Sequence, residues 1–233
     1  MHYQLFGAMG SSLNDTSSSI PLIIWLNGGP GSSSLFGAFT ENGPIRILEN
    51  KTKLFDYPWN FVGHTLYIDQ PLNVGFSYSG NRTGEKQVSS ANEGATHLLN
   101  FMYNFYREWP KLTASPLYII GESYAGHYVP AFARTLVLNE TFLAATKVTL
   151  KGVALGDGWV DPINQMNFYD SLLYSVGIVS NKFRDVCTWY QTQGMINIYK
   201  DEFKTVFFSL FRQLPSGTTL PTMELFGIPI WVE

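Results

Sequence analysis

The stretch PLYIIGESYAGHYVPA, from Pro116 to Ala131, decides how this sequence is interpreted. Its first residues form an apolar run of strand length, and the run leads straight into Gly121 and a segment that can be helical. A strand, a tight turn and a helix are the context of a nucleophile elbow, in which small residues flank a serine two positions away on each side. Gly121 and Ala125 flank Ser123 in this way, although the general pattern has glycine at the second place. The stretch therefore predicts an elbow serine at position 123, with an ordinary turn as the alternative.

Strand-length apolar runs alternate with helix-period segments in the first two thirds of the chain. The runs are Pro21–Leu26, Thr65–Asp69, Pro116–Gly121 and Leu150–Gly158. A stripe with three- and four-residue spacing predicts a helix that ends at Pro110 and includes Ala91, Ala95, Leu98, Leu99, Met102, Phe105 and Trp109. Because strands that alternate with helices form parallel sheets through crossover connections, we expect an α/β fold: a mostly parallel sheet with helices on both faces.

The pattern changes near Asp161. Beyond it the strand signal disappears, and the sequence predicts two or three helices, broken near Gly177 and Gly194. We expect a partial α/β core over residues 1–160, a helical insertion or lid segment over residues 161–215, and an irregular tail over residues 216–233.

The composition is that of an ordered globular chain. Of its 233 residues, 45% are hydrophobic and 14% are charged, and the formal net charge is −3. Disordered chains have less apolar content, and nucleic-acid binding depends on clustered Lys and Arg. The longest apolar runs are far shorter than the roughly 20 residues that cross a bilayer. We therefore expect no nucleic acid and no membrane span, and the composition leaves the oligomeric state open.

Signals of cellular location point in different directions. The first residues have neither the basic start nor the apolar run of a secretory leader. The single Cys187 has no partner for a disulfide within the chain, so we interpret it as a small buried hydrophobe. Asn-x-Thr patterns favour the secretory route, although such patterns also arise by chance; they begin at Asn14, Asn50, Asn81 and Asn139.

A glycine-rich loop, WLNGGPGSSS from Trp25 to Ser34, follows the first buried run. It lacks the Lys of the G-x-x-x-x-G-K phosphate loop, which makes a phosphate cradle the weaker interpretation. In a hydrolase with a nucleophile elbow, a loop at this position supplies one backbone donor of the oxyanion hole, and the residue after the nucleophile, here Tyr124, supplies the other. The loop and the elbow therefore support the same hypothesis.

The histidines predict no metal site and no evident catalytic base. His2, His64 and His97 are scattered, without the spacing of metal ligands. His127 lies four residues after Ser123, one helical turn further along, which favours local packing over contact with the serine hydroxyl. We expect no metal and no cofactor.

Five blocks in order carry a resemblance to a known family: WLNGGPGSSS, FTENGPIRI, LYIDQPLNVGFSYSG, YIIGESYAGHYVPA and GVALGDGWVDP, between Trp25 and Pro162. They resemble successive blocks of the serine carboxypeptidases of the α/β-hydrolase superfamily, closest to the vitellogenic-like branch. Ser32 stands where many members have Cys, so a family disulfide is absent there. The resemblance implies a carboxypeptidase that needs no cofactor, takes peptide or protein C-termini as substrate, and is secreted, lysosomal or vacuolar.

The resemblance also implies roles for individual residues. Ser123 matches the nucleophile, and Gly29 with Tyr124 match the oxyanion donors. The residues that match the holders of the free substrate carboxylate, with the tryptophan that supports them, are Asn27, Glu41, Glu122 and Trp25. If Glu41 and Glu122 are close and partly buried, they share a proton and one can donate a hydrogen bond to that carboxylate. This predicts best peptidase activity at mildly acid pH; a surface carboxylate is the alternative for Glu41.

The other members of a catalytic triad are not recognisable in this sequence. In hydrolases of this architecture the acid and the histidine follow the serine along the chain, but no histidine follows His127. The later acids Asp157, Asp161, Asp170 and Asp185 then have no histidine to orient, and Asp157 is better interpreted as a strand-end residue. We therefore expect the front part of a carboxypeptidase, inactive alone and with an open sheet edge. An acyltransferase of the same family and a truncated non-catalytic binder of peptides or a partner remain open.

Overall fold

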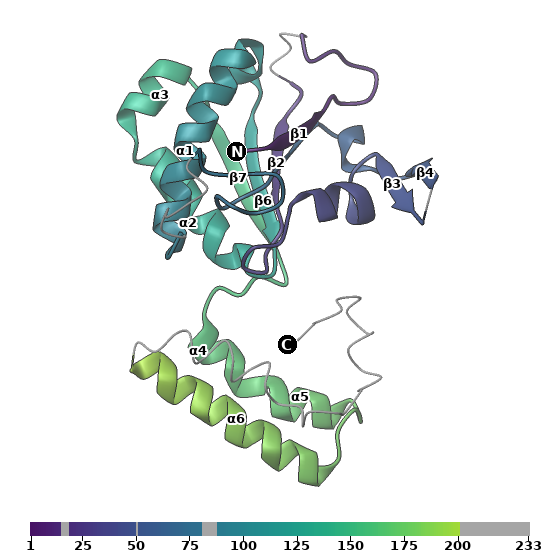
Figure 1. The fold of residues 1–233 in the computed structure, drawn as a ribbon, viewed down its shortest axis with the longest axis vertical. Coiled ribbons are helices and arrows are strands. Elements are labelled where there is room, and N and C mark those ends of the chain that lie inside the picture. The colour runs from purple at the N-terminus through teal and green to yellow at the C-terminus, as the bar shows by residue number, and fades with distance from the viewer. Residues whose placement is uncertain (15–18, 50, 81–87, 201–233) are drawn as a thin grey trace. The chain divides into compact units, whose positions relative to one another are not determined.

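The computed structural model describes residues 1–14, 19–49, 51–80 and 88–200 (Figure 1). The chain divides into two compact units: unit 1 is Met1–Val160 and unit 2 is Asp161–Glu233. Residues 201–215 of the expected helical segment, and the whole of the expected tail, lie outside the described residues.

A five-stranded sheet forms the centre of unit 1. Its strands lie in the order β1-β5-β2-β6-β7, with β1 antiparallel to β5 and every other pair parallel. Their bounds are Tyr3–Phe6 for β1, Leu22–Leu26 for β2, His64–Ile68 for β5, Leu117–Glu122 for β6 and Leu150–Gly156 for β7. Each apolar run of the sequence is thus a strand, and the mostly parallel sheet is as expected.

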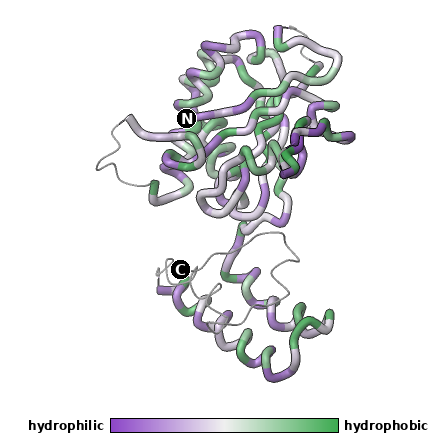
Figure 2. Tube along the Cα trace, turned by 45° about the vertical axis from the view of Figure 1, so that its right-hand side comes forward, coloured by the Kyte–Doolittle hydropathy of each residue, from purple (hydrophilic) through white to green (hydrophobic). Residues whose placement is uncertain are grey.

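Burial explains why these runs are continuous rather than alternating. Every residue of β2 and β5 is buried, as is typical of parallel strands covered on both faces. In Figure 2 hydrophobic colouring gathers in the interior of unit 1. β7 forms one edge of the sheet among the described residues, and most of its side chains are exposed, Val153 and Leu155 included.

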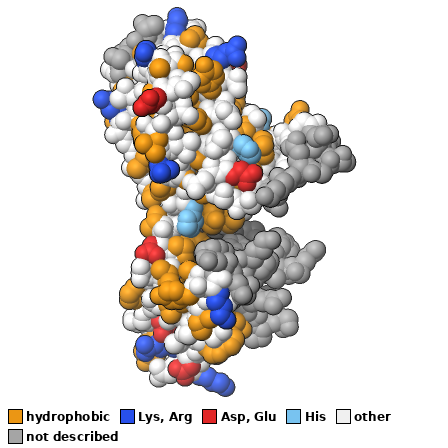
Figure 3. Space-filling model, turned by 90° about the vertical axis from the view of Figure 1, so that its left-hand side faces the viewer, with side chains coloured by type: hydrophobic (Ala, Val, Ile, Leu, Met, Phe, Trp, Pro, Cys, Tyr) orange, Lys and Arg blue, Asp and Glu red, His pale blue; other side chains and the backbone are white. Residues whose placement is uncertain are grey.

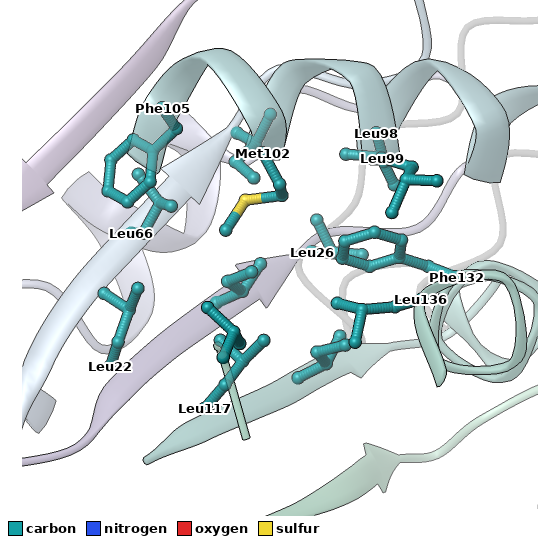
Figure 4. Close-up of a cluster of buried hydrophobic side chains, with 14 of the residues drawn as sticks. Leu22, Leu26, Leu66, Leu98, Leu99, Met102, Phe105, Leu117, Phe132 and Leu136 are labelled. Atoms are coloured by element: carbon teal, nitrogen blue, oxygen red, sulfur yellow. The ribbon is translucent and has the colours of Figure 1, made fainter. Parts of the chain in front are cut away.

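Helices α1 (Ala91–Glu108) and α2 (Ala125–Val137) cover one face of the sheet. The start of α1 is fixed by Ser90, whose hydroxyl accepts a hydrogen bond from the Glu93 amide, a cap that satisfies one free donor of the first turn. The helix ends before Pro110, as the stripe predicted. Figure 4 shows side chains of both helices meeting strand leucines: Leu98, Leu99, Met102, Phe105, Phe132 and Leu136 against Leu22, Leu26, Leu66 and Leu117.

The other face of the sheet carries shorter elements. Trp25 and Tyr67 point to this side, where they pack with Ala38 and Trp59. The elements are the π-helix η1 (Gly37–Glu41) and the 3₁₀ turn η2 (Trp59–Phe61), with the hairpin β3 (Ile45–Leu48) and β4 (Lys51–Leu54) beside them. On the α1 side, the turn η3 (Pro110–Ala114) leads into β6, and α3 (Glu140–Thr146) leads into β7.

Unit 2 is helical in its described part. It consists of α4 (Pro162–Gln165), η4 (Met166–Phe168), α5 (Tyr169–Ser175) and α6 (Asn181–Tyr199). The predicted break at Gly177 is present, at φ +75° just after α5. The predicted break at Gly194 is wrong: the residue lies inside α6, where the side chain of Met166 occupies the space that a Cβ would need. Its missing side chain serves close packing rather than a turn. Cys187 is buried in α6, as expected.

Charged side chains are spread over the surface in Figure 3. On the face drawn in Figure 3, positively and negatively charged side chains are interspersed with hydrophobic ones. Among the described residues, no helix has the length and apolar character that crossing a membrane requires.

Candidate active site

Ser123 lies on a strained turn between β6 and α2. Its backbone has φ +56°, a left-handed conformation that is uncommon for a residue with a side chain and typical of a nucleophile elbow. A Cβ at Gly121 would lie 2.6 Å from both the Ala125 side chain and the Leu26 carbonyl, so both flanking positions must be small. The serine is therefore on an elbow rather than an ordinary turn.

The segment after β7 holds the elbow in place. The Ser123 amide donates to the Gly156 carbonyl at 3.0 Å and lies 3.1 Å from Asp157 Oδ1, while the Trp159 amide donates to the Ser123 carbonyl at 2.9 Å. Asp157 directly follows the last residue of β7, as predicted, but the sequence did not reveal its contact with the elbow. The signal was present in retrospect: a strand parallel to β6 must end at the same edge of the sheet.

The glycine-rich loop lies directly against the elbow. β2 and β6 are parallel neighbours with Leu26 opposite Gly121, so the residues after both strands meet at one edge. A Cβ at Gly28 would lie 2.5 Å from the Tyr124 amide nitrogen, and only glycine permits that approach. Gly29, the next residue, adopts φ +110° before a cis bond to Pro30. The structure thus brings together the predicted residues Gly29, Ser123 and Tyr124.

Asn27 joins the two predicted carboxyl groups. Its Nδ2 donates to Glu122 Oε1 at 2.7 Å and to Glu41 Oε1 at 3.3 Å. Its Oδ1 accepts from Trp25 Nε1 at 2.9 Å and from the Gly37 amide at 3.1 Å, which fixes the orientation of the amide group. All four residues that the resemblance assigned to carboxylate binding therefore form one hydrogen-bonded cluster beside the elbow.

The π-helix η1 places Glu41 in this cluster. Its backbone hydrogen bond from the Asn42 amide to the Gly37 carbonyl, 3.0 Å, spans five residues. This geometry is rare in proteins, and where it occurs it is often at a functional site. The Arg46 guanidinium donates to the carbonyls of Thr40 and Glu41, each at 2.8 Å, and so caps the last turn. The alternative of a surface carboxylate is therefore wrong for Glu41, which is only partly exposed.

Burial and mutual repulsion change the charge of the carboxyl pair. Burial, followed by the negative charge of Glu122, raises the pKa of Glu41 to about 7. Burial, followed by the charge of Asp157, also raises the pKa of Glu122. Two carboxyl groups this close do not both ionise readily, so below neutral pH the pair retains a proton. A neutral carboxyl group can then donate a hydrogen bond to an anion.

His127 packs beside the elbow rather than serving it. Its ring lies 4.8 Å from the Tyr124 ring and 6.2 Å from the Trp159 ring, and burial lowers its pKa. Within the ranges that the structure describes, no hydrogen bond joins the Ser123 hydroxyl to a histidine, and no group of three His, Cys, Asp or Glu side chains could hold a metal ion.

Comparison with known proteins identifies the family. The family model named serine carboxypeptidase matches residues 1–209. The chain belongs to the serine carboxypeptidase family. It is 36% identical over 198 residues to the venom serine carboxypeptidase of Apis mellifera, covering 84% of this chain and 41% of that relative. It is 42% identical over 164 residues to the vitellogenic carboxypeptidase of Aedes aegypti, covering 68% of this chain and 33% of that relative.

A solved structure of the family shares the fold. The match is to the crystal structure of Kex1(delta)p, a prohormone-processing carboxypeptidase from Saccharomyces cerevisiae, with a TM-score of 0.70 and 30% identity, over 84% of this chain and 42% of that one. The family and the α/β-hydrolase fold expected from the sequence are thereby confirmed. The chain spans less than half the length of each of these serine carboxypeptidases.

Proposed function

We propose that this serine carboxypeptidase releases the last residue of a peptide through an acyl-enzyme on Ser123. The observation that carries the proposal is the Asn27 amide bridging Glu41 and Glu122 beside the elbow. Such a cluster offers donors to the free carboxylate that distinguishes a chain end from the middle of a chain.

The elbow and the glycine-rich loop supply the groups for acyl transfer. Ser123 Oγ attacks the last peptide carbonyl, and the backbone N–H groups of Gly29 and Tyr124 stabilise the oxyanion that develops. The support for this pairing is the close approach of Gly28, the residue before Gly29, to the Tyr124 amide and the Ser123 side chain. Water then takes the acyl group from the serine.

Turnover also requires a base. A serine hydroxyl is a poor nucleophile unless a neighbouring group takes its proton. In this architecture the catalytic histidine follows the serine along the chain. Of the four histidines only His127 follows Ser123, and its ring packs against the Tyr124 ring. We propose that these 233 residues do not hydrolyse peptides by themselves. This proposal rests on the absence, among the described residues, of a hydrogen bond between the Ser123 hydroxyl and a histidine.

We further propose secretory routing, to the cell exterior or to a lysosome. The relatives named venom and vitellogenic carboxypeptidase favour that route. Of the four Asn-x-Thr patterns, Asn14 is exposed and Asn139 caps α3, while Asn50 and Asn81 lie outside the described residues. Endoglycosidase treatment of the secreted protein should lower its mass, with an Asn14→Gln variant as the matched control for that site.

The nucleophile can be tested with a fluorophosphonate probe, on the protein expressed from its complete coding sequence. We expect labelling at Ser123 and its loss in Ser123→Ala. The same protein should release the last residue from peptides with a free C-terminus, and fail on the amidated peptides. Transfer of the acyl group to an added alcohol in preference to water would indicate an acyltransferase, and a folded protein that neither reacts nor hydrolyses would indicate a binder.

A further inference from the structure

Another carboxyl group lies outside the hydrogen-bonded cluster of Trp25, Asn27, Glu41 and Glu122, here called the clamp. It is more deeply buried than either glutamate. Asp69 follows β5 at the carboxyl edge of the sheet and is 0% exposed. A buried carboxylate is destabilising unless it is fully hydrogen-bonded, and Asp69 has partners on both oxygens. The Ser33 hydroxyl donates to Oδ1, the Phe76 amide donates to Oδ2 at 3.0 Å, and His2 Nδ1 lies 3.0 Å from Oδ2.

These partners belong to three separate segments of unit 1. His2 precedes β1, and Phe76 belongs to the loop after β5. Gly75 has no side chain where Asp69 lies, and a Cβ there would collide with the carboxylate. Ser33 belongs to the glycine-rich loop, and its hydroxyl also accepts from the Leu35 amide at 3.1 Å. Asp69 thus attaches the far end of that loop to the strand beneath it.

The attachment matters because the glycines of the loop make it costly to order. Three of its residues are glycines, which lose the most conformational freedom on ordering. Its near end is held by Asn27. The backbone N–H of Asn27 donates to the Ser34 hydroxyl at 3.2 Å, and the Asn27 side chain belongs to the clamp. Its far end is held by the hydrogen bond from Ser33 to Asp69. Between these two anchors lie Gly28 and Gly29.

We infer that Asp69 is a positioning residue for the oxyanion hole, acting through Ser33 on the backbone at Gly29. This rests on the proposed function, because it assigns a purpose to a loop that the proposal makes an oxyanion donor. A bond from a hydroxyl to a carboxylate is about twice as strong as one between neutral groups. A misplacement of about 1 Å at a reacting centre can lower a rate about a hundredfold.

The test measures the second-order rate of fluorophosphonate labelling at Ser123 and kcat/KM for an ester substrate without a free carboxylate. We expect Asp69→Asn to lower both about ten- to a hundredfold. The fall should occur in kcat, while KM stays nearly unaltered. Ser33→Ala should lower both to a similar degree, and Ser33→Thr, which keeps the hydroxyl, should restore most of the rate. The double variant Asp69→Asn with Ser33→Ala should be no slower than the slower single variant, because both changes break one connection.

Ser11→Ala is the matched control. It deletes a hydroxyl that donates at 2.9 Å to the Ala8 carbonyl, away from the glycine-rich loop, and should leave labelling unchanged. If Asp69→Asn does not fold, the Ser33 variants carry the test, since Ser33 is only partly buried. Folded Ser33→Ala and Asp69→Asn proteins that label at the wild-type rate would overturn the inference and leave the proposed function intact. A folded wild type that does not label at all would overturn both.

Discussion

Two regions of unit 1 share strands β2 and β6 and differ in almost every physical respect. Beneath α1 and α2, alternate side chains of β2, namely Leu22, Ile24 and Leu26, enter an apolar core in which nearly every residue is fully buried. One residue beyond β2, the chain enters a polar edge of amides, carboxyl groups and a left-handed serine. The core gains free energy from removing apolar surface from water, and the edge contains strain and buried charge that cost free energy.

The difference shows that the strained polar edge depends on the apolar core for its geometry. Backbone strain and buried carboxyl groups persist only where the surrounding structure holds them in place. Here the holding is done by the parallel strands, which bring the ends of β2, β5 and β6 to one edge, and by the core that fixes those strands. Changes at the edge should therefore act mainly on chemistry, and changes in the core should act mainly on stability.

Ser123→Gly should give the largest effect and should move activity and stability in opposite directions. Removing a serine nucleophile lowers kcat about a millionfold, so labelling and hydrolysis should disappear. Glycine adopts φ +56° without strain, so the free energy of unfolding should rise by about 1 kcal/mol. Lys147→Gly is the control: Lys147 has φ +59° after α3, and its replacement should stabilise similarly with unchanged labelling. A Ser123→Gly protein less stable than the wild type in urea unfolding would contradict the assignment of strain.

Phe132→Ala should have the opposite signature. Phe132 of α2 is fully buried between α1 and the sheet, and such truncations cost about 3–5 kcal/mol through lost burial and the cavity that remains. The labelling rate of the folded fraction should stay near that of the wild type. Val137→Ala, a change at an exposed site of the same helix, should alter the unfolding free energy by less than about 0.5 kcal/mol. Equal losses in the two variants would show that the core of unit 1 does not lie where the structure places it.

Gly28→Ala tests the point at which the loop meets the elbow. The new Cβ would lie 2.5 Å from the Tyr124 amide nitrogen, so the loop must move away from the oxyanion position. We expect labelling to slow about a hundredfold and stability to fall by about 1–3 kcal/mol. Gly80→Ala is the control, because no atom of the described residues lies within 4 Å of a Cβ there. Unchanged labelling in Gly28→Ala would separate the loop from the reaction.

The sequence predicted the fold because its signals were local. Continuous apolar runs gave the strands, and the stripe between Ala91 and Trp109 gave α1 with its end. It also placed the elbow, since only small residues allow the backbone approach at Gly121. What it missed depends on partners distant in the chain. Gly194 lies inside α6, where it makes room for the Met166 side chain. Periodicity alone cannot tell such a packing glycine from one that breaks a helix.

The site was predicted less completely for the same physical reason. The family resemblance supplied Asn27, Glu41 and Glu122, and the structure brings them together. The contacts of Asp157 with the elbow and of Asp69 with Ser33 come from neighbouring strands ending at one edge, which depends on strand order. No pattern within a window of sequence contains that order.

The smallest predicted effect concerns the charge of the clamp, and its sign follows from the direction of the pKa shift. The pKa of Glu41 is raised from an ordinary 4.5 to about 7, so the folded protein binds this proton more tightly than the unfolded chain does. The contribution of Glu41 to stability is therefore full below about pH 4.5 and is lost as the pH rises through about 7. Binding of a substrate carboxylate should weaken over the same upper range, because ionisation removes the donor and adds repulsion.

Glu41→Gln replaces the protonated carboxyl group with an amide that stays neutral at every pH. The measurement is the ratio of kcat/KM for a peptide to that for the matching ester without a free carboxylate, taken from pH 5 to 8, because the ratio cancels the titration of the catalytic base. In the wild type one group of pKa about 7 should lower the ratio about tenfold between pH 6 and 8. In Glu41→Gln the ratio should change by less than about threefold, since only Glu122 still titrates. The control Glu49→Gln, at an exposed carboxylate of the β3–β4 hairpin, should retain the full wild-type fall. A tenfold fall that persists in Glu41→Gln would show that the pH dependence originates outside the polar edge, and the two regions would then differ in strain alone.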